Sequence, residues 1–306
     1  MKVTDPILRV TASAECDRAP PVAIECGGYR VQPLLDGYFT MSLGDLVGVT
    51  PAEIGPIQQA AGLDPDSIEL PVFAFLLTGQ GRTILVDAGT STGMMASLGK
   101  LPAALAALGV APEAIDAVLI THMHPDHLNG ITSAEGTRLF PYADILIARE
   151  EWAYWTDAAR LEDAAPHIQY ILASHRHALA PYREADRIRL FDDGAVVAPG
   201  IVARLLPGHT AGHCGFALGD AMLLWGDALH LVPLQLQCPQ CALGHDHDFA
   251  QSEHTRRQVL GELVETGTLL AGAHVPAPGI GRIVSKSGQY TFVAAGPETG
   301  SERDTL

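Results

Sequence analysis

Short apolar runs and amphipathic segments alternate along most of the chain. Apolar runs typical of strands occur at 29–39, 70–79, 83–89, 115–121, 187–191, 201–208, 214–219, 221–227 and 268–274. Segments with helical spacing of apolar residues occur at 50–62, 100–110, 149–161, 166–179 and 248–267. Strands that alternate with helices in this way predict an α/β domain built from layered sheets and helices.

The segment 50–62 also carries the local signals that start a helix. Thr50 is the predicted N-cap, and Pro51 occupies the first helical position, where the missing N–H of proline costs nothing. Glu53 completes a capping box, because its side chain can return to the Thr50 backbone N–H. The sequence therefore predicts a helix that begins at Pro51.

Length and composition indicate one globular unit. The chain has 306 residues, of which 47% are hydrophobic and 18% are charged, so it can bury a sizeable core. The sequence contains no evident linker, repeat or low-complexity tract. We therefore expect an N-terminal extension at 1–30 and a single domain at 31–306.

The charge balance excludes some classes of partner. Lys and Arg number 19 against 35 Asp and Glu, which gives a formal net charge of -16. Such a chain does not attract phosphate backbones or anionic lipids, so we expect no nucleic-acid and no membrane partner. No run approaches the roughly 18 apolar residues of a membrane span, and no signal peptide is evident. We expect a cytoplasmic protein that acts on a small molecule. The sequence leaves open whether the protein forms a homodimer.

Five cysteines, an odd number, argue against a disulfide framework and for a reducing compartment. Cys238 and Cys241 form a CxxC pair, but a zinc ribbon needs a second pair, which the sequence lacks. A redox pair would normally open a helix in a thioredoxin-like unit. We interpret both residues as packing or loop thiols.

The segment THMHPDHLNG follows an apolar run and crowds three histidines and an aspartate together. His122, His124 and Asp126 alternate, so an extended segment would direct them to one side, whereas His127 requires the chain to turn. Pro125 favours extended geometry at His124. Titratable groups this close together indicate metal binding more than a solvated loop.

Three further polar residues follow apolar runs. His209 lies in PGHTAGH, Asp227 in WGDALH and His274 in GAHVP. With the first segment they make five histidines and two aspartates. Imidazole and carboxylate ligands suit zinc or another borderline divalent ion better than calcium.

In this order and spacing, THMHPDH, GHTAGH, GDAL and GAHVP resemble the motifs of the metallo-β-lactamase superfamily. The resemblance implies an α/β fold of the αββα sandwich type, with two divalent metal ions, most simply Zn²⁺, at the ends of the two sheets. The ligands it implies are His122, His124 and His209 for one ion, Asp126, His127 and His274 for the other, and Asp227 as a bridge between them.

Further segments resemble one branch of that superfamily. DGYF, EEWAYW and the run from GDALHLVPLQ to GAHVPAPGIGRI are similar to methyl parathion hydrolase and to N-acyl homoserine lactone lactonases. Zinc β-lactamases usually lack an aspartate bridge such as Asp227. Glyoxalase II-like enzymes carry a basic C-terminal region that we do not find here, and nucleases of the fold need a basic surface. Mononuclear persulfide dioxygenases of the fold need fewer ligands than this chain offers.

Together these features predict a dinuclear metal-dependent hydrolase. A hydroxide that bridges two metal ions would attack the carbonyl of a lactone or carboxylic ester, and the positive centre would stabilise the developing oxyanion. Hydrolysis of a phosphotriester is the alternative within the same chemistry. A catalytically silent, metal-stabilised binding protein is the alternative from another class, although a closed structural zinc site needs no bridging carboxylate.

Two residues are candidates for roles beside the metals. His230 lies three residues after the catalytic Asp227, where lactonases of this fold often place a tyrosine that touches the substrate. It is therefore either a catalytic hydrogen-bond donor or leaving-group acid, or a pocket-wall histidine. Asp87, after another strand, either orients a ligand histidine or caps a turn.

Aromatic residues and the remaining histidines complete the candidates. Phe73, Trp152 and Trp155 are the predicted substrate-binding wall, with plain core packing as the alternative for the two tryptophans because of their helical spacing. The remaining histidines are interpreted as solvated loop or helix residues, with adventitious metal binding considered for GHDHDF; they include His175, His177, His245 and His247.

Overall fold

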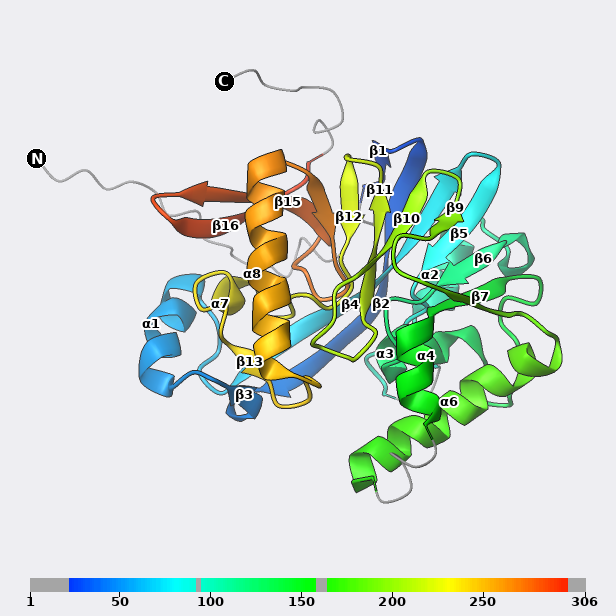
Figure 1. Ribbon diagram of the computed structural model, residues 1–306, viewed down its shortest axis with the longest axis horizontal. Helices are drawn as coiled ribbons and strands as arrows, with labels where there is room; N and C mark the ends of the chain where they lie inside the picture. Colours follow the sequence, from blue (N-terminus) through cyan, green and yellow to red (C-terminus); the bar gives the residue numbers. More distant parts are fainter. Residues whose placement is uncertain (1–21, 92–94, 158–163, 297–306) are drawn as a thin grey trace, which may run out of the picture.

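Two seven-stranded sheets pack face to face in the computed structural model, which describes residues 22–91, 95–157 and 164–296 (Figure 1). The first sheet has the order β1 (Ile24–Cys26), β2 (Tyr29–Ser42), β4 (Ser67–Gly79), β5 (Arg82–Val86), β6 (Ala117–Leu119), β7 (Asp144–Ala148), β8 (Ile188–Phe191). The second has the order β16 (Gln289–Ala294), β15 (Ile280–Lys286), β14 (Leu269–Ala271), β12 (Met222–Leu224), β11 (Cys214–Leu218), β10 (Ile201–Leu205), β9 (Val196–Ala198).

Helices cover the outer faces of both sheets (Figure 1). The α-helices are α1 (Pro51–Ala61), α2 (Leu101–Ala107), α3 (Pro125–Leu128), α4 (Arg149–Thr156), α6 (Pro166–Glu184), α7 (Val232–Gln235) and α8 (Phe249–Thr266). Short 3-10 helices span Leu43–Asp45, Pro112–Ala114 and Asn129–Ile131, and β3 (Leu46–Val47) pairs with β13 (Ala242–Leu243). The layers therefore form the αββα sandwich that the sequence motifs predicted.

Strand β4 shows why both faces of the first sheet are apolar. Phe73, Phe75 and Leu77 belong to the core between the sheets, whereas Ala74 and Leu76 belong to the core beneath the outer helices. Successive side chains of a strand point to opposite faces, so a strand covered on both sides is apolar throughout. Burying each large side chain contributes about 1.5–3 kcal/mol.

Parallel strands bring several chain segments to one edge of the molecule. In the first sheet β5, β6 and β7 run parallel, so the segments after Val86, Leu119 and Ala148 meet. In the second sheet β12 and β14 are parallel, and β10 has the same direction because β11 is antiparallel to both β10 and β12. The segments after β10, β12 and β14 therefore also leave at one edge.

Local predictions were confirmed in part. Helix α1 begins at Pro51, with Thr50 and Glu53 forming the predicted capping box. Helix α6 continues beyond the predicted end, through Pro181 to Glu184. The strand predicted at 115–121 is confined to Ala117–Leu119.

The remaining differences concern the ends of the chain and one helix. Strand β1 already pairs with β2 inside the segment interpreted as an extension, and residues 1–21 lie outside the described part. The predicted helix 149–161 corresponds to α4, which ends at Thr156 with Asp157 as its C-cap, and residues 158–161 lie outside the described part. Among the described residues, no helix has the length and apolar character needed to cross a membrane.

Candidate metal centre

The loops after β6, β10, β12 and β14 bring the predicted ligands together. Their ring nitrogens and carboxylate oxygens form overlapping groups, and the ligand atoms of each group lie within 4.8 Å of one another. Groups made only of predicted ligands are His122, His124 and His209; His122, His127 and Asp227; and Asp126, His127 and His274. Two further groups include His230, namely Asp227, His230 and His274, and His209, His230 and His245.

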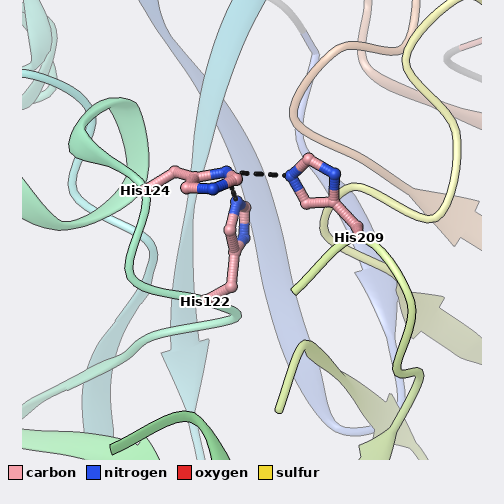
Figure 2. A group of neighbouring side chains, drawn as sticks. All are labelled: His122, His124 and His209. Carbon is pink, nitrogen blue, oxygen red and sulfur yellow. Dashed lines mark hydrogen bonds between the residues drawn. The ribbon is translucent and has the colours of Figure 1, made fainter. Parts of the chain in front are cut away.

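Three imidazoles converge in the first group (Figure 2). His122 Nε2 lies 3.0 Å from His124 Nδ1, and His209 Nε2 lies 2.9 Å from the same atom. His124 Nδ1 is thus within hydrogen-bond distance of two other ring nitrogens, but a single N–H there could satisfy only one of these contacts. Three ring nitrogens that face one point are the arrangement expected around a cation.

Neighbouring hydrogen bonds fix which nitrogens carry lone pairs. The Thr121 hydroxyl donates to Asp87 Oδ2 at 2.8 Å, so its oxygen accepts the Nδ1–H of His122 at 3.1 Å. His209 Nδ1 lies 2.7 Å from the carboxylate of Asp246, to which it donates. Both histidines therefore direct the lone pair of Nε2 towards the convergence point.

The second group combines two imidazoles and a carboxylate. Asp126 Oδ2 lies 3.5 Å from Nε2 of both His127 and His274. His127 donates its Nδ1–H to Asp87 Oδ2 at 2.8 Å, and His274 donates its own to the carbonyl oxygen of Pro71 at 2.7 Å. Asp87 thus holds the ring of His127, a predicted ligand, and it does so from a left-handed backbone conformation with φ 59°.

Helix α3 explains the division between the groups. It begins at Pro125 with His124 as its N-cap, so the extended alternation ends at His124. The prediction that Asp126 would share one side with His122 was therefore wrong. The helical turn instead carries Asp126 and His127 to the second group.

Asp227 lies between the two groups. The distances from its Oδ2 atom to histidine Nε2 atoms are 3.6 Å for His122, 3.5 Å for His209, 3.2 Å for His127 and 3.2 Å for His274. One carboxylate oxygen therefore contacts imidazoles of both groups.

The backbone at Asp227 is held by another buried histidine. The Asp227 N–H donates to His213 Nε2 at 2.9 Å, and His213 Nδ1 donates to the carbonyl oxygen of Leu206 at 2.7 Å. Gly226 adopts φ 57°, and a Cβ there would lie 2.6 Å from His213 Nε2. Glycine before Asp227 is therefore needed both for its backbone conformation and for space.

Electrostatics leave the first group available for a metal. Burial lowers the pKa of His122, His124 and His209 well below its ordinary value, and neighbouring imidazoles add to this effect. These rings are therefore neutral, which is the form that binds metal.

In the second group the electrostatic effects on the histidine pKa have the opposite outcome. Burial acts to lower the pKa of His127 and His274, but the carboxylates of Asp227 and Asp126 outweigh burial and raise it. Burial acts to raise the pKa of Asp227, but the surrounding imidazoles lower it well below its ordinary value. An ionised carboxylate surrounded by imidazole nitrogens requires positive charge among them, from protons or from metal.

Unpaired buried atoms test whether the residues fit a metal. Among the described residues, Asp227 Oδ1 and His127 Nε2 are buried without a hydrogen-bond partner. Such atoms are costly in an apolar interior unless something binds them. The donor set is imidazole and carboxylate, which suits a zinc-like ion. The residues present therefore fit a metal centre.

Glu151 is a buried acid that the sequence interpretation missed. Its Oε1 accepts hydrogen bonds from the N–H of Met123 and from Trp155 Nε1, both at 2.8 Å. Its Oε2 accepts from the Thr210 hydroxyl at 2.7 Å and from the N–H of Gly212 at 3.0 Å. Burial raises the pKa of Glu151, although these four hydrogen bonds oppose the shift. Glu151 thereby ties the first histidine segment to the loop that carries His209.

A cavity of about 200 Å³ opens beside the first group, with His124 and His209 among its lining residues. Trp155, Ile168 and Ile171 form its apolar part. The predicted wall residue Trp155 thus lines this cavity.

The other two predicted wall residues lie elsewhere. Phe73 is buried in the core between the sheets, against Phe75. Trp152 packs against the core beneath the outer helices, with the Arg183 guanidinium 5.3 Å from its ring centroid. Apolar periodicity identifies buried faces but does not distinguish a pocket from a core.

The remaining histidines differ in position. His175 is only 4% exposed and donates its Nε2–H to the carbonyl oxygen of Met123, so its interpretation as solvated was wrong. His177 is exposed, as predicted. His245 and His247 are exposed but line the cavity.

His230 and the two cysteines complete the predicted positions. His230 is buried, and its Nε2 lies 2.8 Å from Asp227 Oδ2. Cys238 is partly exposed and Cys241 is buried, and both are free thiols. Among the described residues, neither belongs to a group of potential metal ligands.

Comparisons with known proteins agree with this architecture. The family model described as the metallo-beta-lactamase superfamily matches residues 68–230. A solved structure described as hydrolase AbOPH in the beta lactamase superfamily has a TM-score of 0.85 and 27% identity, over 91% of this chain and 98% of that one. AidC, a dizinc quorum-quenching lactonase, shares the fold with a TM-score of 0.77 at 21% identity, over 90% of this chain and 97% of its own.

Curated relatives match over a shorter stretch. Hydroxyacylglutathione hydrolase of Fuscovulum blasticum is 33% identical over 163 residues, which are 51% of this chain and 48% of the relative. Hydroxyacylglutathione hydrolase 2 of Vibrio vulnificus is 30% identical over 115 residues, 38% of this chain and 33% of the relative. The match thus spans a third to a half of these relatives. The family model covers more than half of the chain, and the chain therefore belongs to the metallo-beta-lactamase superfamily.

Proposed function

We propose that the protein is a dinuclear metal-dependent hydrolase that opens a lactone or cleaves a carboxylic ester. The position of Asp227 carries the proposal. Its Oδ2 lies 3.5 Å from His209 Nε2 of the first group and 3.2 Å from His274 Nε2 of the second. One carboxylate placed between two ligand groups is the arrangement that would bridge two ions.

The proposed ligands follow the two groups, and zinc is the preferred ion. The first ion would be held by His122, His124 and His209, the second by Asp126, His127 and His274, and both by Asp227. When bound, divalent ions polarise a substrate oxygen and lower the pKa of water, so that hydroxide becomes available near neutral pH.

The chain's own residues would bind and orient the substrate. An acyl or alkyl group fits the part of the cavity lined by Trp155, Ile168 and Ile171, which places the scissile carbonyl towards His124 and His209. Among the residues that the structure describes, neither Lys nor Arg lines this cavity. A neutral ester or lactone with an apolar group is therefore favoured over an anionic substrate.

His230 is the proposed hydrogen-bonding residue of the reaction. Its Nε2 lies 2.8 Å from Asp227 Oδ2, which places the imidazole at the edge of the ligand groups. Burial lowers its pKa to about 4, although Asp227 opposes the shift, so the ring is neutral near pH 7. Its one N–H donates to Asp227 Oδ2 in this structure, and it would become free to donate to an oxygen that develops negative charge once Asp227 ligates the ions.

Two related proteins support this choice of substrate, and two others favour an alternative. AidC is described as a lactonase with the product N-hexanoyl-L-homoserine bound, and a further solved hydrolase holds the same product at its catalytic metal centre. The curated relatives are hydrolases of hydroxyacylglutathione. That substrate is the second candidate, and the cavity lining counts against it because the described residues there include neither Lys nor Arg.

A substrate panel on the metal-loaded protein tests the proposal. Lactones and aryl esters should be cleaved faster than phosphotriesters, hydroxyacylglutathione or β-lactams, with about two metal ions per chain by elemental analysis. Asp227→Ala should lower both metal content and turnover. One ion per chain in the active enzyme would contradict the dinuclear centre. Faster cleavage of a phosphotriester would change the reaction class, and no turnover of any panel member would favour a binding protein.

A further inference from the structure

An exposed histidine stands over the first ligand group. The ring centroid of His245 lies 5.5 Å from that of His209, 5.9 Å from that of His124 and 5.9 Å from that of His230. His245 lines the cavity, and its side chain is exposed although the other three are buried. A molecule that enters the cavity towards His209 therefore meets His245 at the entrance.

The backbone of this loop fixes where His245 points. The N–H of His247 donates to the carbonyl oxygen of His209 at 2.9 Å, which ties the two loops together. Between His245 and His247, the buried side chain of Asp246 accepts a hydrogen bond from His209. The segment is a turn, in which the Asp246 N–H donates to the Leu243 carbonyl oxygen, and it presents both exposed histidines to the cavity.

His245 is not needed as a metal ligand. It forms a group with His209 and His230, but His209 has only one nitrogen free, since Asp246 holds the other. That nitrogen lies 2.9 Å from His124 Nδ1 and belongs to the first ligand group. His245 and His230 would then remain as two ligands, too few for a separate zinc site.

A neighbouring buried atom indicates what His245 does instead. His230 Nδ1 is buried without a hydrogen-bond partner among the described residues. A polar atom of a bound molecule between the His230 and His245 rings would have an imidazole on each side. Ile168 and Ile171, which also line the cavity, offer an apolar surface.

We propose that His245 is a substrate-contacting residue that hydrogen-bonds the polar part of an ester or lactone whose apolar part lies against Ile168 and Ile171. The proposal rests on the proposed hydrolase function and deepens it. His245 acts on substrate binding, because it lies at the entrance, outside the ligand groups around Asp227. Its loss should therefore raise KM more than it lowers kcat.

Kinetics of matched variants test the proposal with an aryl hexanoate ester as substrate. His245→Ala should raise KM about 3–10-fold, the value of one hydrogen bond, with kcat within about 2-fold of wild type. His245→Asn retains an N–H donor and should recover part of the loss. His254→Ala removes an exposed histidine from α8 and serves as the control, with wild-type KM. Metal content should be the same in all four proteins.

Binding of hexanoate, the product, separates this proposal from the proposed function. Calorimetry on the metal-loaded proteins should give a Kd that is about 3–10-fold weaker for His245→Ala than for wild type. If wild type cleaves no ester but binds hexanoate in this His245-dependent way, the proposed function fails and the role of His245 stands. Equal affinity in both proteins, no measurable affinity, or loss of a metal equivalent in His245→Ala overturns the role of His245.

Discussion

His209 Nδ1 lies 2.7 Å from Asp246 Oδ1, although the two residues are 37 positions apart in the chain. Asp246 Oδ2 accepts hydrogen bonds from the Ser252 hydroxyl at 3.1 Å and from the Leu243 N–H at 3.3 Å. The carboxylate is therefore held in place on both sides. It keeps the proton of His209 on Nδ1 and leaves the lone pair of Nε2 for a metal.

Asp246→Ala should weaken metal binding without removing a ligand. Loss of a partner that orients a ligand histidine typically lowers metal affinity about 10–100-fold. Asp246→Asn keeps a hydrogen-bond acceptor and should lose less. Metal retained after dialysis against graded chelator concentrations measures the effect.

Asp248 provides a matched control in the same loop. Its side chain accepts from the N–H of Gln251 and caps α8, so Asp248→Ala should cost about 1 kcal/mol of stability and leave metal affinity unchanged. Equal metal affinity in Asp246→Ala and wild type would show that Asp246 does not support the centre.

The contrast between the proposed ligands and the residues that support them shows what the sequence can predict. His209, Asp227 and His274 each follow an apolar run, and that pattern is visible in the sequence. Asp246 sits in GHDHDF between two exposed histidines, and only tertiary contact reveals that it alone is buried. Asp87 directly follows β5, whereas Glu151 lies inside α4, three residues after the end of β7, so the strand-end argument does not identify it.

Layer order was predictable from motifs, whereas pocket and core were not. Both faces of strand β4 are apolar. Its sequence therefore does not show which face packs against the second sheet and which against the outer helices. Helix α3 also escaped prediction, because four residues are too few for a helical period, and the start of that helix decides which ligand group Asp126 joins.

Glu151→Ala should destabilise the protein strongly. Four donors lose their acceptor in a buried site, and unsatisfied buried donors cost about 1–3 kcal/mol each, so we expect a loss of about 3 kcal/mol or more. Glu151→Gln keeps one acceptor oxygen and should lose less. Urea denaturation measures the free energy of unfolding.

Glu150 is the control for this change. It precedes Glu151 in α4 but is exposed, so Glu150→Ala should stay within about 0.5 kcal/mol of wild type. Similar losses in Glu150→Ala and Glu151→Ala would refute the role of Glu151 as a tether between the two loops.

His175 should make the stability of the protein sensitive to acid. Burial lowers its pKa from 6.5 to about 4 in the folded protein, although the bond to the Met123 carbonyl opposes the shift. Between these values the unfolded chain binds a proton that the folded chain does not. The free energy of unfolding therefore falls as pH drops from about 6.5 to about 4, by up to about 3 kcal/mol from this residue.

Comparison of His175→Gln with wild type isolates this contribution. Urea denaturation at pH 7 and pH 5, at equal metal content, should show a smaller loss of stability in the variant. His177→Gln changes an exposed histidine of the same helix and should keep the wild-type dependence. An unchanged dependence in His175→Gln would contradict the prediction.

His230 should act in the chemical step. Its Nε2 lies 2.8 Å from Asp227 Oδ2, and its ring stacks on His274 with centroids 4.9 Å apart, so it is held beside the ligand groups. Removal of one oxyanion donor typically costs about 10²–10³ in turnover, whereas loss of a wall contact mainly raises KM. We expect His230→Ala to lower kcat about 100-fold with metal content retained, and His230→Gln, which keeps a donor, to recover part of it. Steady-state kinetics with metal analysis of each variant decide the matter, since an unchanged kcat with a raised KM would leave His230 as a wall of the pocket.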